Sequence, residues 1–152
     1  MSAKQTDCIP DLIYFVNFIV RNVIPVSTVG HVHNGRGALR SWLTKNGFNP
    51  IFDLSTHQVS KTDLSFISSL TPDAVIAHDP FYGMGVDDIE LAMGVLDQAK
   101  QAIIAAVPTG EHHQVSPAVV YRVKQWVEIL EQLGSVVEIY HCTHYSLFLI
   151  VK

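Results

Sequence analysis

The start of the chain has apolar residues at helical spacing. They recur every three or four positions, at Leu12, Phe15, Val16, Ile19, Val20 and Val23. This period indicates an amphipathic helix with one buried face. Asp11 is a suitable N-cap, and Pro25 is a suitable stop. We therefore expect an N-terminal helix within residues 1–25 that packs on a core.

Beyond this helix, strand-like and helix-like segments alternate. The expected strands are 26–32, 50–54, 74–78 and 103–107, and the expected helices are one ending at Asn46-Gly47, one around 89–99 and one opened by Ser116-Pro117. The segment 55–70 is polar and gives no clear pattern. Alternation of this kind predicts a parallel sheet covered by helices on both faces.

The last two expected strands, 136–142 and 146–151, are joined by about three residues, which is too few for a parallel crossover. They should form an antiparallel hairpin. The sequence thus predicts an α/β fold, a three-layer sandwich with a mostly parallel sheet and a C-terminal antiparallel β-hairpin. Residues 1–152 should form a single domain.

Composition narrows the function classes. The chain has 152 residues, of which 48% are hydrophobic, and its net charge is −4. The acidic excess lies in the second half, which argues against a large basic surface for nucleic acid. Two cysteines cannot form a disulfide framework, and the longest apolar stretch is too polar to cross a membrane. We expect a cytoplasmic protein without a membrane partner.

Candidate binding residues follow the first two strands. A turn with closely spaced glycines, Asn34-Gly35-Arg36-Gly37, lets the backbone approach a ligand after the first strand. Asp53 ends the second strand, where a carboxylate can accept hydrogen bonds from ribose hydroxyls. Together these features predict a nucleoside site.

At these residues the chain resembles the class I S-adenosylmethionine-dependent methyltransferases. Their first motif, an acidic residue, one residue and then Gly-x-Gly-x-Gly, aligns with residues 31–37, where His31 replaces the acid and His33 replaces the first glycine. The resemblance implies a Rossmann-like methyltransferase fold that is shortened in the middle, with S-adenosylmethionine as cofactor. It implies a cofactor site made of His31, His33, Asn34, Gly35, Gly37, Asp53, Asp63 and His78.

A second motif follows the strand at 74–78. Asp79-Pro80-Phe81-Tyr82 differs at one residue from the Asp-Pro-Pro-Tyr motif of amino-methyltransferases that act on adenine or cytosine. The resemblance gives Asp79 and Tyr82 a role in holding the methyl acceptor. A tightly packed turn is the alternative interpretation. His112 and His113 follow the strand at 103–107 and are candidates for a general base.

Eight histidines also suggest a metal site. His31 and His33 share one face of a strand, and His78, His112 or His113 could converge on them with Asp53 or Asp79. No cysteine pair assists, and histidines at loop ends are more often surface residues or hydrogen-bonded. We therefore expect no metal.

The sequence as a whole predicts a methyltransferase acting on a small-molecule acceptor, with nucleic acid disfavoured and a homodimer possible. The alternative is a non-catalytic module of the same fold, whose cofactor site is eroded by His31 and His33. A metal-dependent hydrolase is a third class.

Overall fold

The computed structural model describes residues 3–24, 27–33, 38–55, 58, 66–67, 69–81, 86–109, 122–142 and 145–152. Its helices are α1 (Ala3–Asn22), α2 (Ala38–Lys45), α5 (Val86–Leu96) and α6 (Val123–Leu130). Its strands are β1 (Thr28–His33), β2 (Asn49–Ser55), β3 (Ala74–His78), β4 (Ala102–Pro108), β5 (Ser135–His141) and β6 (Tyr145–Val151).

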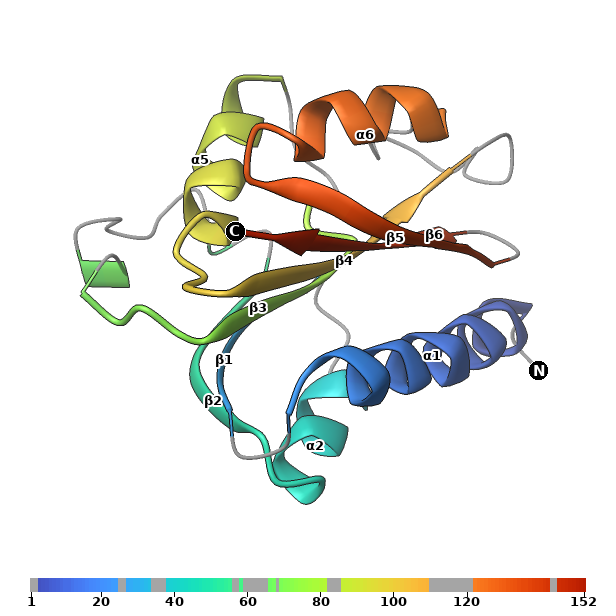
Figure 1. Cartoon of the computed structure of the whole chain (residues 1–152). Coiled ribbons are helices and arrows are strands. Elements are labelled where there is room, and N and C mark those ends of the chain that lie inside the picture. Colours follow the sequence, from blue (N-terminus) through green and yellow to red (C-terminus); the bar gives the residue numbers. More distant parts are fainter. Residues whose placement is uncertain are drawn as a thin grey trace.

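These strands form one sheet in the order β2-β1-β3-β4-β6-β5. The pairs β1–β2, β1–β3 and β3–β4 are parallel, whereas β6 is antiparallel to both β4 and β5. Figure 1 shows α1 and α2 on one face of the sheet and α5 and α6 on the other. The expected three-layer α/β sandwich with a C-terminal antiparallel hairpin is confirmed.

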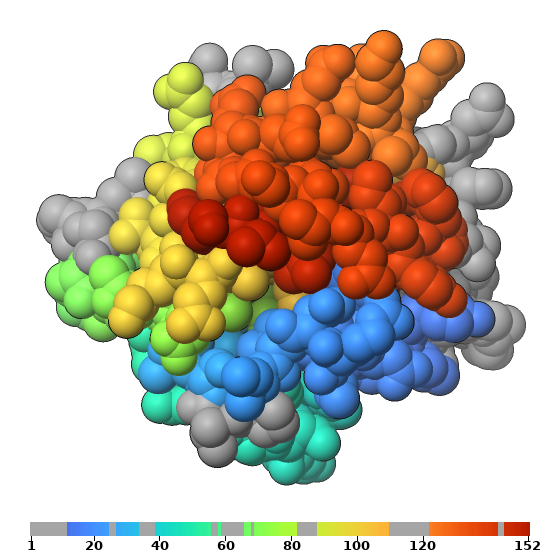
Figure 2. Space-filling view, in the orientation of Figure 1, coloured from blue at the N-terminus to red at the C-terminus, as the bar shows by residue number. Residues whose placement is uncertain are grey.

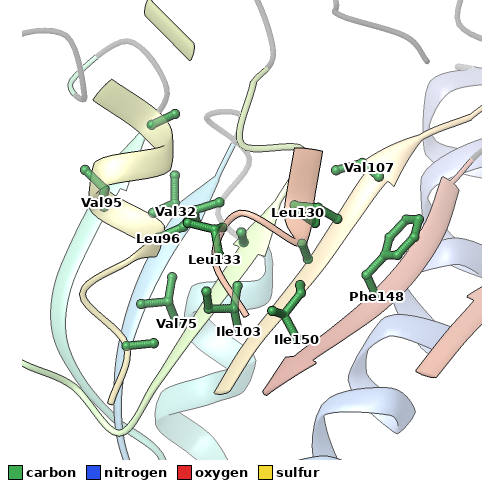
Figure 3. Close-up of a cluster of buried hydrophobic side chains, with 14 of the residues drawn as sticks. Val32, Val75, Val95, Leu96, Ile103, Val107, Leu130, Leu133, Phe148 and Ile150 are labelled. Atoms are coloured by element: carbon green, nitrogen blue, oxygen red, sulfur yellow. The ribbon is translucent and has the colours of Figure 1, made fainter. Parts of the chain in front are cut away.

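Each sheet face has its own apolar core. The core under α5 and α6 includes Val32, Val75, Ile103, Leu130 and Phe148 (Figure 3). The core under α1 and α2 is made of the following buried residues: Phe15, Phe18, Ile19, Val23, Val29, Leu39, Leu43, Phe48, Ala74, Ile76, Ile104, Ala106, Tyr145 and Leu147. β3 and β4 contribute to both cores, so they lie in the middle of the molecule.

Helix α1 also reaches the C-terminal hairpin. Figure 2 shows the blue surface of α1 directly against the orange surface of the hairpin. The contacts between them include the rings of Tyr14 and Tyr140, which are 5.7 Å apart, and the ion pair of Arg21 with Glu138. The first helix and the last strands therefore hold each other in place.

Two helix starts differ from expectation. α1 begins at Ala3 instead of after Asp11, because the residues before Pro10 include good helix formers that extend the helix toward the N-terminus. α6 begins at Val123, after an extended Arg122. The expected start at Ser116-Pro117 lies outside the described residues. At the observed start, the backbone N–H of Arg122 donates to Oε1 of Gln125 at 3.0 Å, which caps the helix locally.

Within the part of the chain that is described, no helix is long and apolar enough to span a membrane.

Candidate functional site

The candidate site lies where the parallel strands end. Along the chain, β2 is added on one side of β1, and β3 and β4 on the other, so the strand order reverses between β1 and β3. In open α/β sheets, ligands bind beyond the carboxyl ends of the strands at such a reversal. His33 and His78, the last residues of β1 and β3, are register partners at this point.

A bulge in β2 decides which face Asp53 occupies. Val29 pairs with Pro50, but Gly30 pairs with Phe52, so Ile51 is an extra residue in the ladder. Without it, Asp53 would lie opposite Val32, on the α5 and α6 face, because register partners share a face of the sheet. With it, Asp53 lies opposite His31, on the same face as both histidines.

Glycine is needed at position 30 for this bulge. A Cβ atom there would lie 2.0 Å from Cζ of Phe52, so the Phe52 ring occupies the space that any side chain would take. The close approach of ring and backbone is possible only because Gly30 has no side chain.

His31, His33 and Asp53 form a compact polar cluster. Asp53 as a carboxylate can only accept hydrogen bonds, so both imidazoles donate to it. Nδ1 of His31 lies 3.2 Å from Oδ2, and Nε2 of His33 lies 2.6 Å from Oδ1. The His31 side chain is fully buried, whereas those of His33 and Asp53 are 11% and 18% exposed. The cluster is therefore anchored in the sheet and open on one side.

The cluster carries a defined charge. Burial lowers the pKa of His31 below its ordinary value, and the hydrogen bond to Asp53 only partly offsets this. Burial alone would raise the pKa of Asp53, but the hydrogen bonds from His31 and His33 outweigh it and lower the pKa to about 2. Arg40 adds a positive charge, with Nε 3.4 Å from Oδ2 of Asp53. At neutral pH the site thus presents an anionic carboxylate beside a neutral His31.

Asp79 follows β3 directly and is strongly constrained. Its φ is 52°, in the left-handed region, and its side chain is buried. Its backbone N–H donates to the carbonyl of Ala106 at 2.8 Å, and the Tyr145 hydroxyl lies 3.4 Å from its Oδ2. His78 packs between the rings of Phe15 and Tyr145, at 5.4 and 5.8 Å. A buried carboxylate on a strained backbone is typical of functional sites.

Phe81 is explained by packing. Its side chain is 2% exposed, and its ring stacks on that of Trp126 at 5.4 Å. Nε1 of Trp126 donates to the carbonyl of Pro108 at 2.9 Å. Phe81, the residue that differs from the Asp-Pro-Pro-Tyr motif, is therefore part of the core, as is Trp126.

The structure brings together four of the site residues named from the sequence: His31, His33 and Asp53 by contact, and His78 as the register neighbour of His33. Asp79 comes next along the chain. The other site residues named from the sequence lie outside the described residues: Asn34, Gly35, Gly37, Asp63, Tyr82, His112 and His113.

Thr109, Tyr145 and Ser146 are polar residues near this edge that were not named as site residues from the sequence. Antiparallel pairing places Tyr145 beside Pro108 and Ser146 beside Val107, so the start of β6 meets the carboxyl end of β4. Oγ of Ser146 lies 3.1 Å from Oγ1 of Thr109 and 3.0 Å from Nδ1 of His141. The hairpin was the signal that could have identified these residues. A last strand that runs antiparallel to β4 begins beside the carboxyl end of β4.

Comparisons with known proteins agree with this architecture. No protein-family model and no curated protein matches the chain. Solved structures do match. The 1,6-didemethyltoxoflavin-N1-methyltransferase of Burkholderia thailandensis, solved with 1,6-didemethyltoxoflavin and S-adenosylhomocysteine bound, superimposes with a TM-score of 0.65 at 13% identity, over 91% of this chain and 76% of that one.

Two further structures give the same picture. An O-methyltransferase family protein from Burkholderia thailandensis has a TM-score of 0.62 at 12% identity; the match covers 83% of this chain but only 51% of that protein. The methyltransferase domain of bacterial CtHen1 has a TM-score of 0.55 at 11% identity, over 90% and 95% of the two chains. The chain therefore has the Rossmann-like fold of S-adenosylmethionine-dependent methyltransferases.

Proposed function

We propose that this chain is an S-adenosylmethionine-dependent methyltransferase with a small-molecule acceptor. The observation that carries the proposal is Asp53, an oriented and ionised carboxylate at the end of β2, beside the point where the strand order reverses. A carboxylate at this place in a nucleotide-binding α/β sheet accepts hydrogen bonds from ribose hydroxyls. The structural neighbours, one of them solved with S-adenosylhomocysteine, support this cofactor class.

The described residues fit the ribose of such a cofactor. A carboxylate has about four lone-pair sites, and the two imidazoles use one each, so Asp53 can still accept from two hydroxyls. Its side chain is partly exposed, which gives a ligand access. His33 stands where the resembling family has its first glycine, but its ring is bonded to Asp53 and mostly buried.

When bound, S-adenosylmethionine supplies a methyl group that its sulfonium already activates. The protein's main task is then to align the acceptor, since proximity and orientation lower the barrier. His31 and His33 fix the Asp53 carboxylate, and Asp53 accepts from the ribose hydroxyls. Asp79 and Tyr82 hold the acceptor, and His112 or His113 takes its proton where the acceptor must lose one.

Calorimetric titration with S-adenosylmethionine and S-adenosylhomocysteine tests the proposal. The protein is first treated with a chelator. Wild type should bind both ligands, and Asp53→Asn should weaken binding by at least about tenfold, because hydrogen bonds to a charged acceptor are lost. Asp97→Asn is the matched control, because this carboxylate pairs with Lys152 and is not part of the cluster of His31, His33 and Asp53. Its affinity should equal that of wild type.

Two outcomes would refute the proposal. One is the absence of heat with either ligand in a folded wild-type sample, which would favour a non-catalytic module of the same fold. The other is an Asp53→Asn variant that binds as tightly as wild type, which would move the cofactor elsewhere.

A further inference from the structure

The polar cluster at the ends of β1 and β2 has the donor set of a metal site. One ligand atom from each of His31, His33 and Asp53 lies within 4.8 Å of the other two. Ligands of a tetrahedral zinc ion lie roughly 3.4 Å apart at ordinary bond lengths. The two distances to Asp53, 3.2 and 2.6 Å, are both somewhat shorter than this separation, so these donors must move slightly apart, by side-chain rotation, to receive an ion.

The backbone holds these donors in place. His31 and His33 are two residues apart on one strand, so their side chains share a face, and their ring centroids are 4.7 Å apart. Asp53 is brought opposite His31 by the Ile51 bulge. Sites on paired strands are more rigid than sites on loops, which favours tight and selective binding.

A second observation points to a ligand. Nε2 of His31 is fully buried and has no hydrogen-bond partner among the described residues. Asp53 is therefore the one polar partner that these residues give His31. A buried imidazole with one unpartnered nitrogen is costly in an apolar core, and such a group indicates a ligand-binding role for the ring rather than a packing role.

We infer that His31, His33 and Asp53 bind a divalent zinc ion. Two imidazoles and one carboxylate form the donor set of several catalytic zinc sites, which keep a fourth position for water or a ligand oxygen or nitrogen. The opening lies on the side of His33 and Asp53, the two partly exposed ligands. The metal site shares Asp53 with the proposed cofactor site, but metal binding does not require methyl transfer or the proposed function.

Among the residues that the structure describes, Arg40 is the positively charged neighbour that opposes a cation. Its Nε lies 3.4 Å from Oδ2 of Asp53, but its side chain is 67% exposed. It can therefore turn into solvent when an ion arrives. Removing its charge should strengthen metal binding.

Titration of the chelator-treated full chain with Co²⁺ tests the inference, since Co²⁺ takes the same ligands and reports four-coordination through intense visible absorption. Wild type should bind one Co²⁺ per chain, Zn²⁺ should displace it, and excess Mg²⁺ should not. His33→Gln and Asp53→Asn should each weaken binding by at least about tenfold. Arg40→Gln should strengthen it by about two- to fivefold.

His141→Gln is the matched control, because His141 is an exposed histidine on β5 that pairs with Ser146. It should bind Co²⁺ like wild type. The inference is overturned if wild type gives no four-coordinate spectrum, if both His33→Gln and Asp53→Asn bind normally, or if His141→Gln loses the ion equally. Circular dichroism shows which variants fold. If His33→Gln does not fold, Asp53→Asn tests the inference instead, because asparagine has nearly the same shape as aspartate.

This result is distinguishable from the test of the proposed function. Cofactor binding is measured in metal-free protein, and metal binding is measured without cofactor. Asp53→Asn weakens both. His33→Gln removes a metal ligand but only loosens the carboxylate that accepts from the ribose, so it should weaken metal binding more than cofactor binding.

Discussion

At the scale of single residues, His31 is the most deeply buried polar residue among the described residues of the site. Its side chain is fully buried, and it pairs with Asp53 through Nδ1. Because burial disfavours the imidazolium, the pKa of His31 lies below 6.5 in the folded protein. Protons therefore bind more readily to His31 in the unfolded chain, and acid favours unfolding.

We predict that the free energy of unfolding of metal-free protein falls as the pH is lowered through about 6.5. His31 contributes at most about 1.4 kcal/mol per pH unit. Asp53 acts in the same direction at lower pH: its contribution is present above 3.8 and is lost as the pH falls toward about 2. Urea unfolding at a series of pH values measures this.

The His31→Asn variant should show a smaller loss of stability between about pH 7 and about pH 5, because the titrating group is gone. Gln132→Asn, an exposed substitution without a titrating group, should keep the wild-type slope. An unchanged slope in the His31 variant would contradict the assignment.

At the scale of elements, the pairing of β1 with β2 controls the site. The Ile51 bulge, with Phe52 over Gly30, puts Asp53 on the histidine face. A one-residue change of register would move Asp53 to the opposite face. The glycine and the ring are therefore a structural requirement of the site, although neither carries its chemistry.

We predict that Gly30→Ala destabilises the protein by about 1–3 kcal/mol, because the new methyl group would overlap the Phe52 ring. Chemical denaturation measures the loss. In a Phe52→Leu background the same substitution should be less harmful, since the smaller side chain can make room. Equal losses in both backgrounds would show that the ring is not the obstacle.

The helices and strands themselves were largely predictable. The apolar pattern predicted α2, β3, β4 and the C-terminal hairpin close to their observed bounds. β3 and β4 were the clearest, because they are short apolar runs that are buried along nearly their whole length. The helix starts were less predictable. Ala3 and Val123 begin helices where local propensity and side-chain caps compete, and the sequence offered other caps at Asp11 and Ser116.

At the scale of the whole molecule, the sheet has a protected centre and weaker sides. β3 and β4 lie between other strands and under helices on both faces, whereas β5 pairs with β6 alone among the described strands and is mostly exposed. Local opening requires less free energy where fewer apolar contacts must be broken.

We predict that the backbone amides of Val75, Ile76, Ile103 and Ile104 exchange most slowly with solvent, and that those of β5 exchange faster. Hydrogen-exchange mass spectrometry resolves these segments. Protection of β5 equal to that of β3 and β4 would contradict this order, and would indicate that β5 is covered by another molecule.

The sequence by itself determined the α/β architecture and which strand ends carry polar residues. Both follow from local patterns. The spacing of apolar residues distinguishes strands from helices, and parallel strands bring their carboxyl ends to the same edge of the sheet. It therefore indicated His31, His33, Asp53, His78 and Asp79 as neighbours of a common edge.

Tertiary structure alone decided how these residues are paired. The period-two pattern of residues 50–54 does not reveal that Ile51 is an extra residue in the ladder, since this depends on Phe52 finding the space over Gly30 on another strand. Likewise, Tyr145 reaches Asp79 only because β6 runs antiparallel to β4. Contacts between distant segments depend on register and packing, which a local pattern does not encode.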